Sequence, residues 1–95
     1  MKATKYKVIP TVKFKKDRRK LEKRGYNLSL LEDVVDMLAN GQVLPEKYCD
    51  HPLKGDRKGY RDCHIKDDWV LLYKINKGAL TLILSETGTH SDILE

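Results

Sequence analysis

The chain has 95 residues, of which 40% are hydrophobic and 35% are charged, and its formal net charge is +5. This length suffices for a single domain spanning residues 1–95 and leaves no room for a second folding unit, because a shorter unit would bury too little apolar surface. No apolar run approaches the roughly 18 residues that span a bilayer, and the N-terminus lacks a secretory signal, so we expect a cytoplasmic protein with no membrane partner.

The first elements along the chain are a short strand and a basic helix. Residues 6–10 predict an edge strand, which tolerates Pro10 at its end because proline has no amide hydrogen to donate. Residues 12–24 predict a helix whose apolar stripe holds only Val12, Phe14 and Leu21, so that its basic residues face solvent. Gly25 then ends the helix.

Positive charge is concentrated in this N-terminal segment. Residues 1–24 carry a net charge of +9, residues 25–50 carry −4, and the remainder sums to zero. Clustered charge raises the local potential and speeds encounter with an oppositely charged partner. The pattern therefore favours contact with a polyanion or an acidic protein, and the alternative is an ordinary solvated helix face. The candidate residues of this basic surface are Lys15, Lys16, Arg19 and Lys20.

A second helix follows at about residues 29–40. Ser29 and Glu32 have the spacing of a capping box, and the helix is expected to stop at Asn40-Gly41. Apolar residues recur at helical spacing between these ends. They are Leu31, Val34, Val35 and Leu38. The two helices should form an antiparallel hairpin.

Three strands account for the rest of the chain, at about residues 59–65, 69–75 and 80–86. The short links between them imply an antiparallel meander. The strand 69–75 is apolar on both faces, which predicts a central place in the sheet, and we expect Trp69 and Tyr73 to be core residues. The predicted fold class is α+β, with the order β-α-α-β-β-β and a sheet packed against the helical hairpin.

Three histidines in the second half of the chain are candidates for catalysis. They are His51, His64 and His90. RNA is cut without a metal when a base takes the proton of the 2′-hydroxyl, an acid protonates the departing 5′-oxygen, and cations stabilise the phosphorus centre. Histidine titrates near neutrality and suits the first two roles, and lysine or arginine suits the third.

The strand period decides which side chains share a face with His64. Along residues 59–65, His64 lies on the same face as Asp62, while Cys63 and Ile65 lie on the other. Because Cys63 and Ile65 are apolar, they should turn to the helices and leave His64 on the open face. Asp68 begins the next strand and is expected close to His64.

Four motifs in the second half of the chain resemble those of one protein family. They are DHPLKG at 50–55, KGYRDCHI at 58–65, DWVLLYKI at 68–75 and TGTHSDIL at 87–94. In this order and spacing they resemble the YafQ branch of the RelE/ParE toxin superfamily, and the preceding helical hairpin agrees in order and length. Four motifs in register are a specific signal.

The resemblance implies a toxin of a type II toxin-antitoxin system, acting as a ribosome-dependent endoribonuclease on mRNA without a metal or other cofactor. It also implies a cognate antitoxin with an acidic segment that folds on binding, and a toxin-antitoxin complex that binds operator DNA through the antitoxin. The active-site residues carried over by motif are His51, His64, Asp68 and His90. The basic helix would then contact ribosomal RNA.

The chain departs from the family pattern at three positions. Glu86 stands where arginine is common, which removes a possible phosphate ligand. Leu94 replaces a terminal phenylalanine and would weaken stacking on a base. Asp67 replaces proline, so two carboxylates are adjacent, and we favour Asp68 as the one in the site. The basic residues that could replace the missing arginine are Lys54, Arg57, Lys58 and Arg61.

Four other interpretations fit parts of the sequence. A zinc site could use the histidines with a carboxylate, or Cys49 and His51 with Cys63 and His64, but neither set has a standard spacing and neighbours on a strand point to opposite faces. A gyrase-directed inhibitor of the ParE type lacks the histidines. A pure nucleic-acid-binding module would give the three histidines no role. A catalytically weakened relative that binds only its antitoxin is the fourth. Both cysteines are expected to be reduced thiols.

Overall fold

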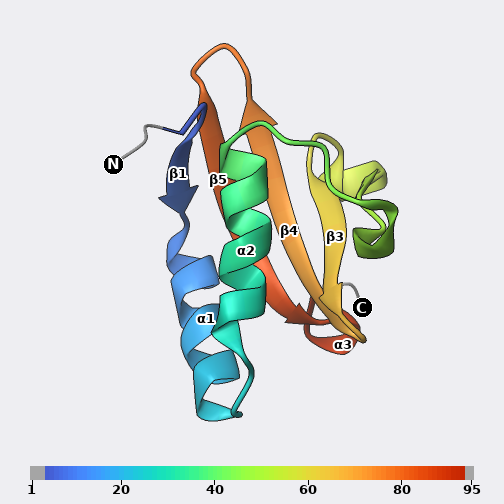
Figure 1. The fold of residues 1–95 in the computed structure, drawn as a ribbon. Coiled ribbons are helices and arrows are strands. Elements are labelled where there is room, and N and C mark those ends of the chain that lie inside the picture. The colour runs from blue at the N-terminus through green and yellow to red at the C-terminus, as the bar shows by residue number, and fades with distance from the viewer. Residues whose placement is uncertain (1–3, 94–95) are drawn as a thin grey trace.

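The computed structural model describes residues 4–93 and shows a five-stranded sheet with two helices across one face (Figure 1). Its elements, in chain order, are β1 (Lys7–Pro10), α1 (Val12–Lys23), α2 (Leu28–Ala39), β2 (His51–Pro52), β3 (Arg61–Lys66), β4 (Trp69–Asn76), β5 (Thr81–Thr89) and α3 (His90–Ile93). Single 3-10 turns lie at Glu46–Tyr48 and Gly55–Arg57. The α+β prediction is confirmed, and β2, α3 and the 3-10 turns are additions to it.

The sheet has the strand order β1-β5-β4-β3-β2. β1 pairs with β5 in parallel, and every other neighbour is antiparallel. β4 is central, as its apolar sequence predicted. β5 continues to Thr89, three residues beyond the predicted end, because Thr87, Gly88 and Thr89 go on pairing with β4. No helix among residues 4–93 is long and apolar enough to cross a membrane.

The α1 helix begins at Thr11, whose side chain accepts a hydrogen bond from the Phe14 amide at 3.0 Å. The expectation that Val12 contributes to the apolar stripe is wrong, because its side chain points to solvent. The third buried position of the helix is instead Asp17, which lies between Phe14 and Leu21. Its carboxylate is satisfied by the Thr87 amide at 3.2 Å and by the Lys13 ammonium.

The α2 helix starts earlier than the capping box indicated. Asn27 is the N-cap, and its side chain accepts from the Ser29 amide at 3.1 Å, so Ser29 is already within the helix. The Asn27 side chain satisfies a free amide of the first turn in the way expected of Ser29. The predicted apolar face is confirmed, and it packs against the sheet together with α1.

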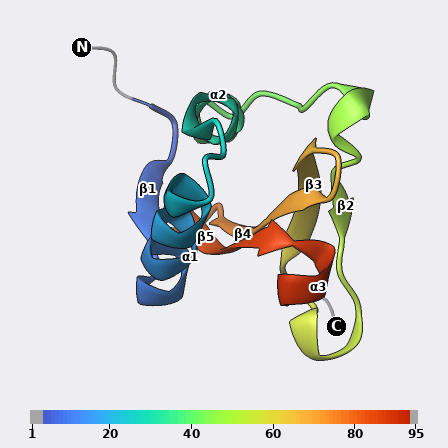
Figure 2. The same ribbon diagram turned by 90° about the horizontal axis from the view of Figure 1, so that it is seen from below.

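The central strand β4 separates two apolar clusters. Trp69, Leu71 and Tyr73 point toward the helices and pack with buried Cys63, as predicted for the core. Burial also raises the pKa of the Cys63 thiol, which keeps it protonated. On the other face, Val70 and Leu72 form a smaller cluster with Ile93 and Leu53. Accordingly, α2 and α3 lie on opposite sides of the β4–β5 ribbon (Figure 2).

Candidate active site

The sheet face opposite the two long helices carries the candidate site. His51 pairs with Asp62, Asp62 with Leu72, and Leu72 with Glu86, so a single row of neighbouring residues crosses β2, β3, β4 and β5. Directly opposed residues in an antiparallel pair project to the same side of the sheet. His64 lies two residues beyond Asp62 along β3 and shares this face. The predicted orientation of β3 is therefore confirmed.

His51 is held by β2, the two-residue strand that the sequence did not reveal. Its Nδ1 lies 2.7 Å from the carbonyl oxygen of Cys49. A carbonyl only accepts, so Nδ1 must carry the hydrogen. Its Nε2 then faces the Asp62 carboxylate, 3.5 Å away.

Asp62 is a buried carboxylate at the floor of the site and is only 1% exposed. Its Oδ1 has no hydrogen-bond partner among residues 4–93. Burial raises the pKa of Asp62, and the nearby histidines His51, His64 and His90 partly offset that shift. The Asp62 carboxylate thus lies beside Nε2 of His51 at the floor of the site, with the other two histidines nearby.

His90 is the first residue of α3, and Asp68 fixes its ring. Nδ1 of His90 lies 2.7 Å from Oδ1 of Asp68, and the His90 amide donates to the Asp68 carbonyl at 3.2 Å. The ambiguity between the adjacent carboxylates is thereby resolved, since Asp67 occupies the turn with a φ of 50°. Asp68 contacts His90, whose ring centroid lies 4.9 Å from that of His64.

The turn that carries His90 is braced by a reciprocal cap. Asp92 accepts from the Thr89 amide at 3.2 Å, and the Asp92 amide donates to the Thr89 hydroxyl at 3.3 Å. These bonds lower the pKa of Asp92, with a smaller contribution from Arg24 of α1. Gly88 makes room for the cap, because a Cβ at this position would lie 3.2 Å from the Asp92 carboxylate.

The three histidines form one group. The ring centroids of His51 and His64 are 6.5 Å apart, and those of His64 and His90 are 4.9 Å apart. Ligand atoms of Asp62, His64 and His90 lie within 4.8 Å of one another, so these residues could hold a metal ion. The mixed cysteine–histidine site is excluded for Cys63, which is buried on the opposite face of β3.

The basic residues of the 54–61 segment have different surroundings. The suggestion that Arg61 serves as a phosphate ligand at this site is wrong, because it lies on the opposite sheet face and pairs with Asp50 at 3.2 Å. Arg57 instead folds toward the site and donates to Glu86 at 2.8 Å. Lys54 and Lys58 are exposed and form no salt bridge within the described residues. Leu94 lies outside those residues.

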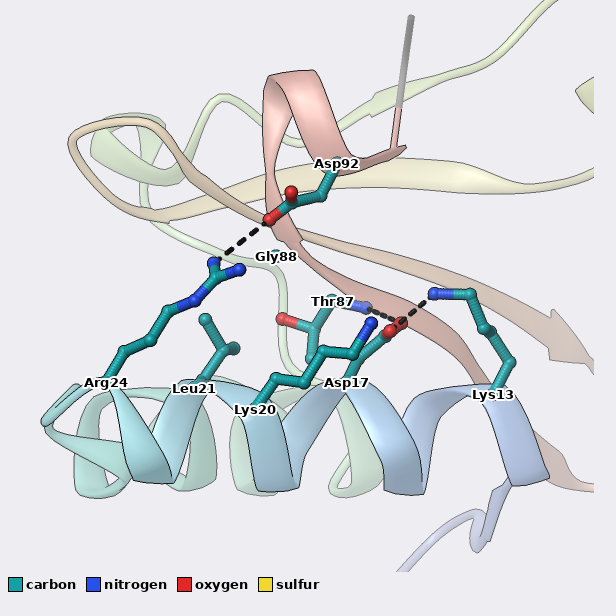
Figure 3. A pocket seen from close by; sticks show the side chains of 8 residues that line it. All are labelled: Lys13, Asp17, Lys20, Leu21, Arg24, Thr87, Gly88 and Asp92. Carbon is teal, nitrogen blue, oxygen red and sulfur yellow. Dashed lines mark hydrogen bonds and ion pairs between the residues drawn. The ribbon is translucent and has the colours of Figure 1, made fainter.

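The basic surface of α1 has the predicted exposure. Lys15, Lys16, Arg19 and Lys20 are all exposed. Lys20 also lines a hollow between α1 and β5, where Lys13 and Arg24 project toward Asp17 and Asp92 (Figure 3). The hollow places part of the positive surface of α1 beside the turn that carries His90.

Two features of the site were missed by sequence reasoning. Asp62 was placed on the open face but was not named as a site residue, although its position two residues before His64 on a strand was a usable signal. The pairing of Arg57 with Glu86 carried no such signal, because the two residues are 29 positions apart and meet only in the fold.

Comparison with known proteins gives consistent matches over most of the chain. A family model described as a bacterial toxin of a type II toxin-antitoxin system, YafQ, matches residues 6–95. The mRNA interferase toxin YafQ of Escherichia coli K12 is 39% identical over 79 residues, which is 82% of this chain and 84% of that protein.

Two solved structures share the fold. A chain of the E. coli DinJ–YafQ toxin-antitoxin complex is 34% identical, with a TM-score of 0.87 over 96% of this chain and 99% of that one. A metal-bound toxin from Helicobacter pylori is 45% identical, with a TM-score of 0.87 over 93% of this chain and 98% of that one.

Proposed function

Because the chain belongs to the YafQ family of bacterial type II toxin-antitoxin toxins, we propose that it is an mRNA interferase, an endoribonuclease that inhibits translation. The observation that carries this proposal is the gathering of three histidines and two carboxylates on one sheet face. This set supplies a base and an acid, two of the groups that metal-free cleavage of RNA requires.

His64 is the proposed general base. Among the described residues, no hydrogen bond engages its ring, so in the neutral form one ring nitrogen is free to accept the proton of the 2′-hydroxyl. The oxygen so activated attacks the adjacent phosphorus, and the bond from phosphorus to the 5′-oxygen breaks. His51, in its protonated form, would offset the negative charge that develops on the phosphoryl oxygens, and Asp62 faces its ring.

His90 is the proposed general acid. The Asp68 carboxylate accepts from Nδ1 and orients the ring, and in the protonated form of His90 the Nε2 hydrogen is available for the departing 5′-oxygen. Asp68 is thus a positioning residue that acts through His90, in the way an aspartate orients the histidine of a catalytic triad. No metal takes part in this scheme, although Asp62, His64 and His90 could bind one.

The proposed substrate is mRNA on the ribosome. The basic surface of α1 would contact ribosomal RNA, and Lys54, Arg57 and Lys58 would contact the message near the site. A cognate antitoxin is the proposed protein partner, since the E. coli relative is seen in a complex with DinJ, and that complex would reach operator DNA through the antitoxin.

A purified translation reaction containing a chelator tests this proposal. Wild type should cut the message inside translated codons, as mapped by primer extension, and His64→Ala and His90→Ala should abolish the cuts. Naked RNA without ribosomes should be cut far less. Intact message in the wild-type reaction would reject the ribonuclease function and would favour a non-nucleolytic inhibitor or a relative that only binds its antitoxin.

A further inference from the structure

Arg57 and Glu86 form a paired site at one end of the histidine face. The Arg57 guanidinium donates to Oε2 of Glu86 at 2.8 Å through one terminal nitrogen, and to the Ile93 carbonyl at 3.0 Å through the other. Glu86 lies in the same row as Asp62 and His51, so the guanidinium is held over the sheet face that carries the histidines. Ile93 belongs to α3, one turn from His90.

The position of Glu86 relative to the catalytic group follows from the sheet. Glu86 and Asp62 are separated by one strand, β4, which corresponds to about 10 Å at the usual spacing between neighbouring strands. An RNA chain with its reacting phosphate beside His64 would carry a further phosphate over this end of the face. Arg57 is therefore placed for a phosphate next to the reacting one.

The chemistry of the pair fits a ligand site. A guanidinium has five N–H donors in a rigid plane, and the bonds to Glu86 and Ile93 use two of them. The Arg57 side chain is 39% exposed, whereas that of Glu86 is 19% exposed, so the cation is the accessible partner. The carboxylate orients the arginine and is itself covered. A Lys13 ammonium 3.8 Å from Glu86 further limits repulsion of a polyanion.

We propose that Arg57 binds a phosphate of the RNA substrate and that Glu86 is its positioning residue. This inference rests on the proposed ribonuclease function and deepens it. From the sequence, Glu86 is a negative charge that would repel RNA. In the fold, its carboxylate sets the direction of the Arg57 guanidinium. Planar, bidentate recognition of phosphate depends on that direction.

Four variants test the proposal by single-turnover cleavage on programmed ribosomes. Arg57→Ala should lower cleavage at limiting toxin by about 10- to 100-fold, the usual effect of losing a charged hydrogen bond. Glu86→Gln should act mainly through a raised KM, because the cation remains but its orientation is lost. Lys77→Ala removes one positive charge from the β4–β5 turn at the opposite end of the sheet (Figure 1) and should cleave like wild type.

The decisive variant moves the guanidinium from position 57 to position 86. In the double variant Arg57→Ala with Glu86→Arg, a guanidinium returns to the same place from β5, and cleavage should recover at least tenfold over Arg57→Ala alone. The salt dependence gives a second readout, since loss of one phosphate contact should reduce the slope of log affinity for a single-stranded substrate by about 0.7. A purely structural ion pair would leave that slope unchanged.

The outcomes separate this inference from the function on which it rests. If wild type cleaves and Arg57→Ala retains both its rate and its salt slope, the phosphate role of Arg57 is wrong and the ribonuclease function stands. If wild type itself does not cleave, both are wrong. Thermal melting of each variant identifies loss of fold. Arg57→Lys keeps the charge without the planar, bidentate guanidinium, and it is used in place of any variant that unfolds.

Discussion

Replacing Asp62 with asparagine should make the protein more stable and less active. The substitution keeps the size of a side chain that is only 1% exposed and removes a charge whose Oδ1 has no partner among the described residues. The asparagine amide would also lack partners there, but an unsatisfied buried group costs about 1 to 3 kcal/mol when it is neutral and more when it is charged. With the attraction of nearby His51 subtracted, we expect a gain of about 1 to 2 kcal/mol at pH 7.

The pH dependence of this gain follows from the pKa. Burial raises the pKa of Asp62, so the folded state binds the proton more tightly than the unfolded state does. Stability from this group is therefore greatest below the unfolded pKa of about 3.9 and falls as the pH rises through the folded pKa. The advantage of Asp62→Asn should be present at pH 7 and should shrink as the pH approaches 4.

Urea unfolding of wild type and Asp62→Asn between pH 4 and 8 measures the effect. A matched control is Asp50→Asn, because Asp50 accepts from the Tyr73 hydroxyl at 2.6 Å and from Arg61 at 3.2 Å, so its loss should destabilise the fold. Cleavage by Asp62→Asn should drop about 10- to 100-fold, because the carboxylate that faces Nε2 of His51 is lost. An Asp62→Asn protein that is less stable than wild type at pH 7 would refute this reasoning.

Three further predictions concern the cap, the core and metals. Asp92→Ala removes the brace of α3 and should lower kcat with little change in KM, and unchanged kcat would show that the cap does not position His90. Trp69→Phe loses the indole hydrogen bond to Thr87 at 2.9 Å and should cost about 1 kcal/mol in urea unfolding. Zn²⁺ should inhibit cleavage by binding to Asp62, His64 and His90. A chelator alone should leave the cleavage rate unchanged. Activation by Zn²⁺ would contradict the proposed mechanism.

The faces of β3 and β4 could be predicted because burial imposes a period of two on a strand. Cys63 and His64 point to opposite sides of the sheet, and the sequence shows this as an alternation of apolar and polar residues. The strand β2 and the helix α3 could not be predicted in this way, since segments of two and four residues carry no periodicity. They exist because β3 and β5 provide the backbone partners and the cap that hold them.

The parts of the site that were missed depend on contacts between distant segments. His51, Asp68 and His90 were identified by residue type and motif, but the pairing of Asp62 with His51 and of Asp68 with His90 became visible only with the strands in register. The error over Arg61 has the same origin, since basic residues in one segment look equivalent until the backbone directs each to a face. The sequence indicated which residue types the site contains, but it did not indicate which of them contact one another.

The parallel pairing of β1 with β5 has a consequence for the order in which the fold assembles. Lys7 pairs with Thr81, and α3 follows directly after β5, so β1 and the turn that carries His90 are both held by the same strand. The pairing of β1 with β5 closes a long loop, and the entropy of closing that loop must be overcome before the contact is gained. The histidine face therefore forms together with the whole sheet, and a fragment without β5 should not assemble it.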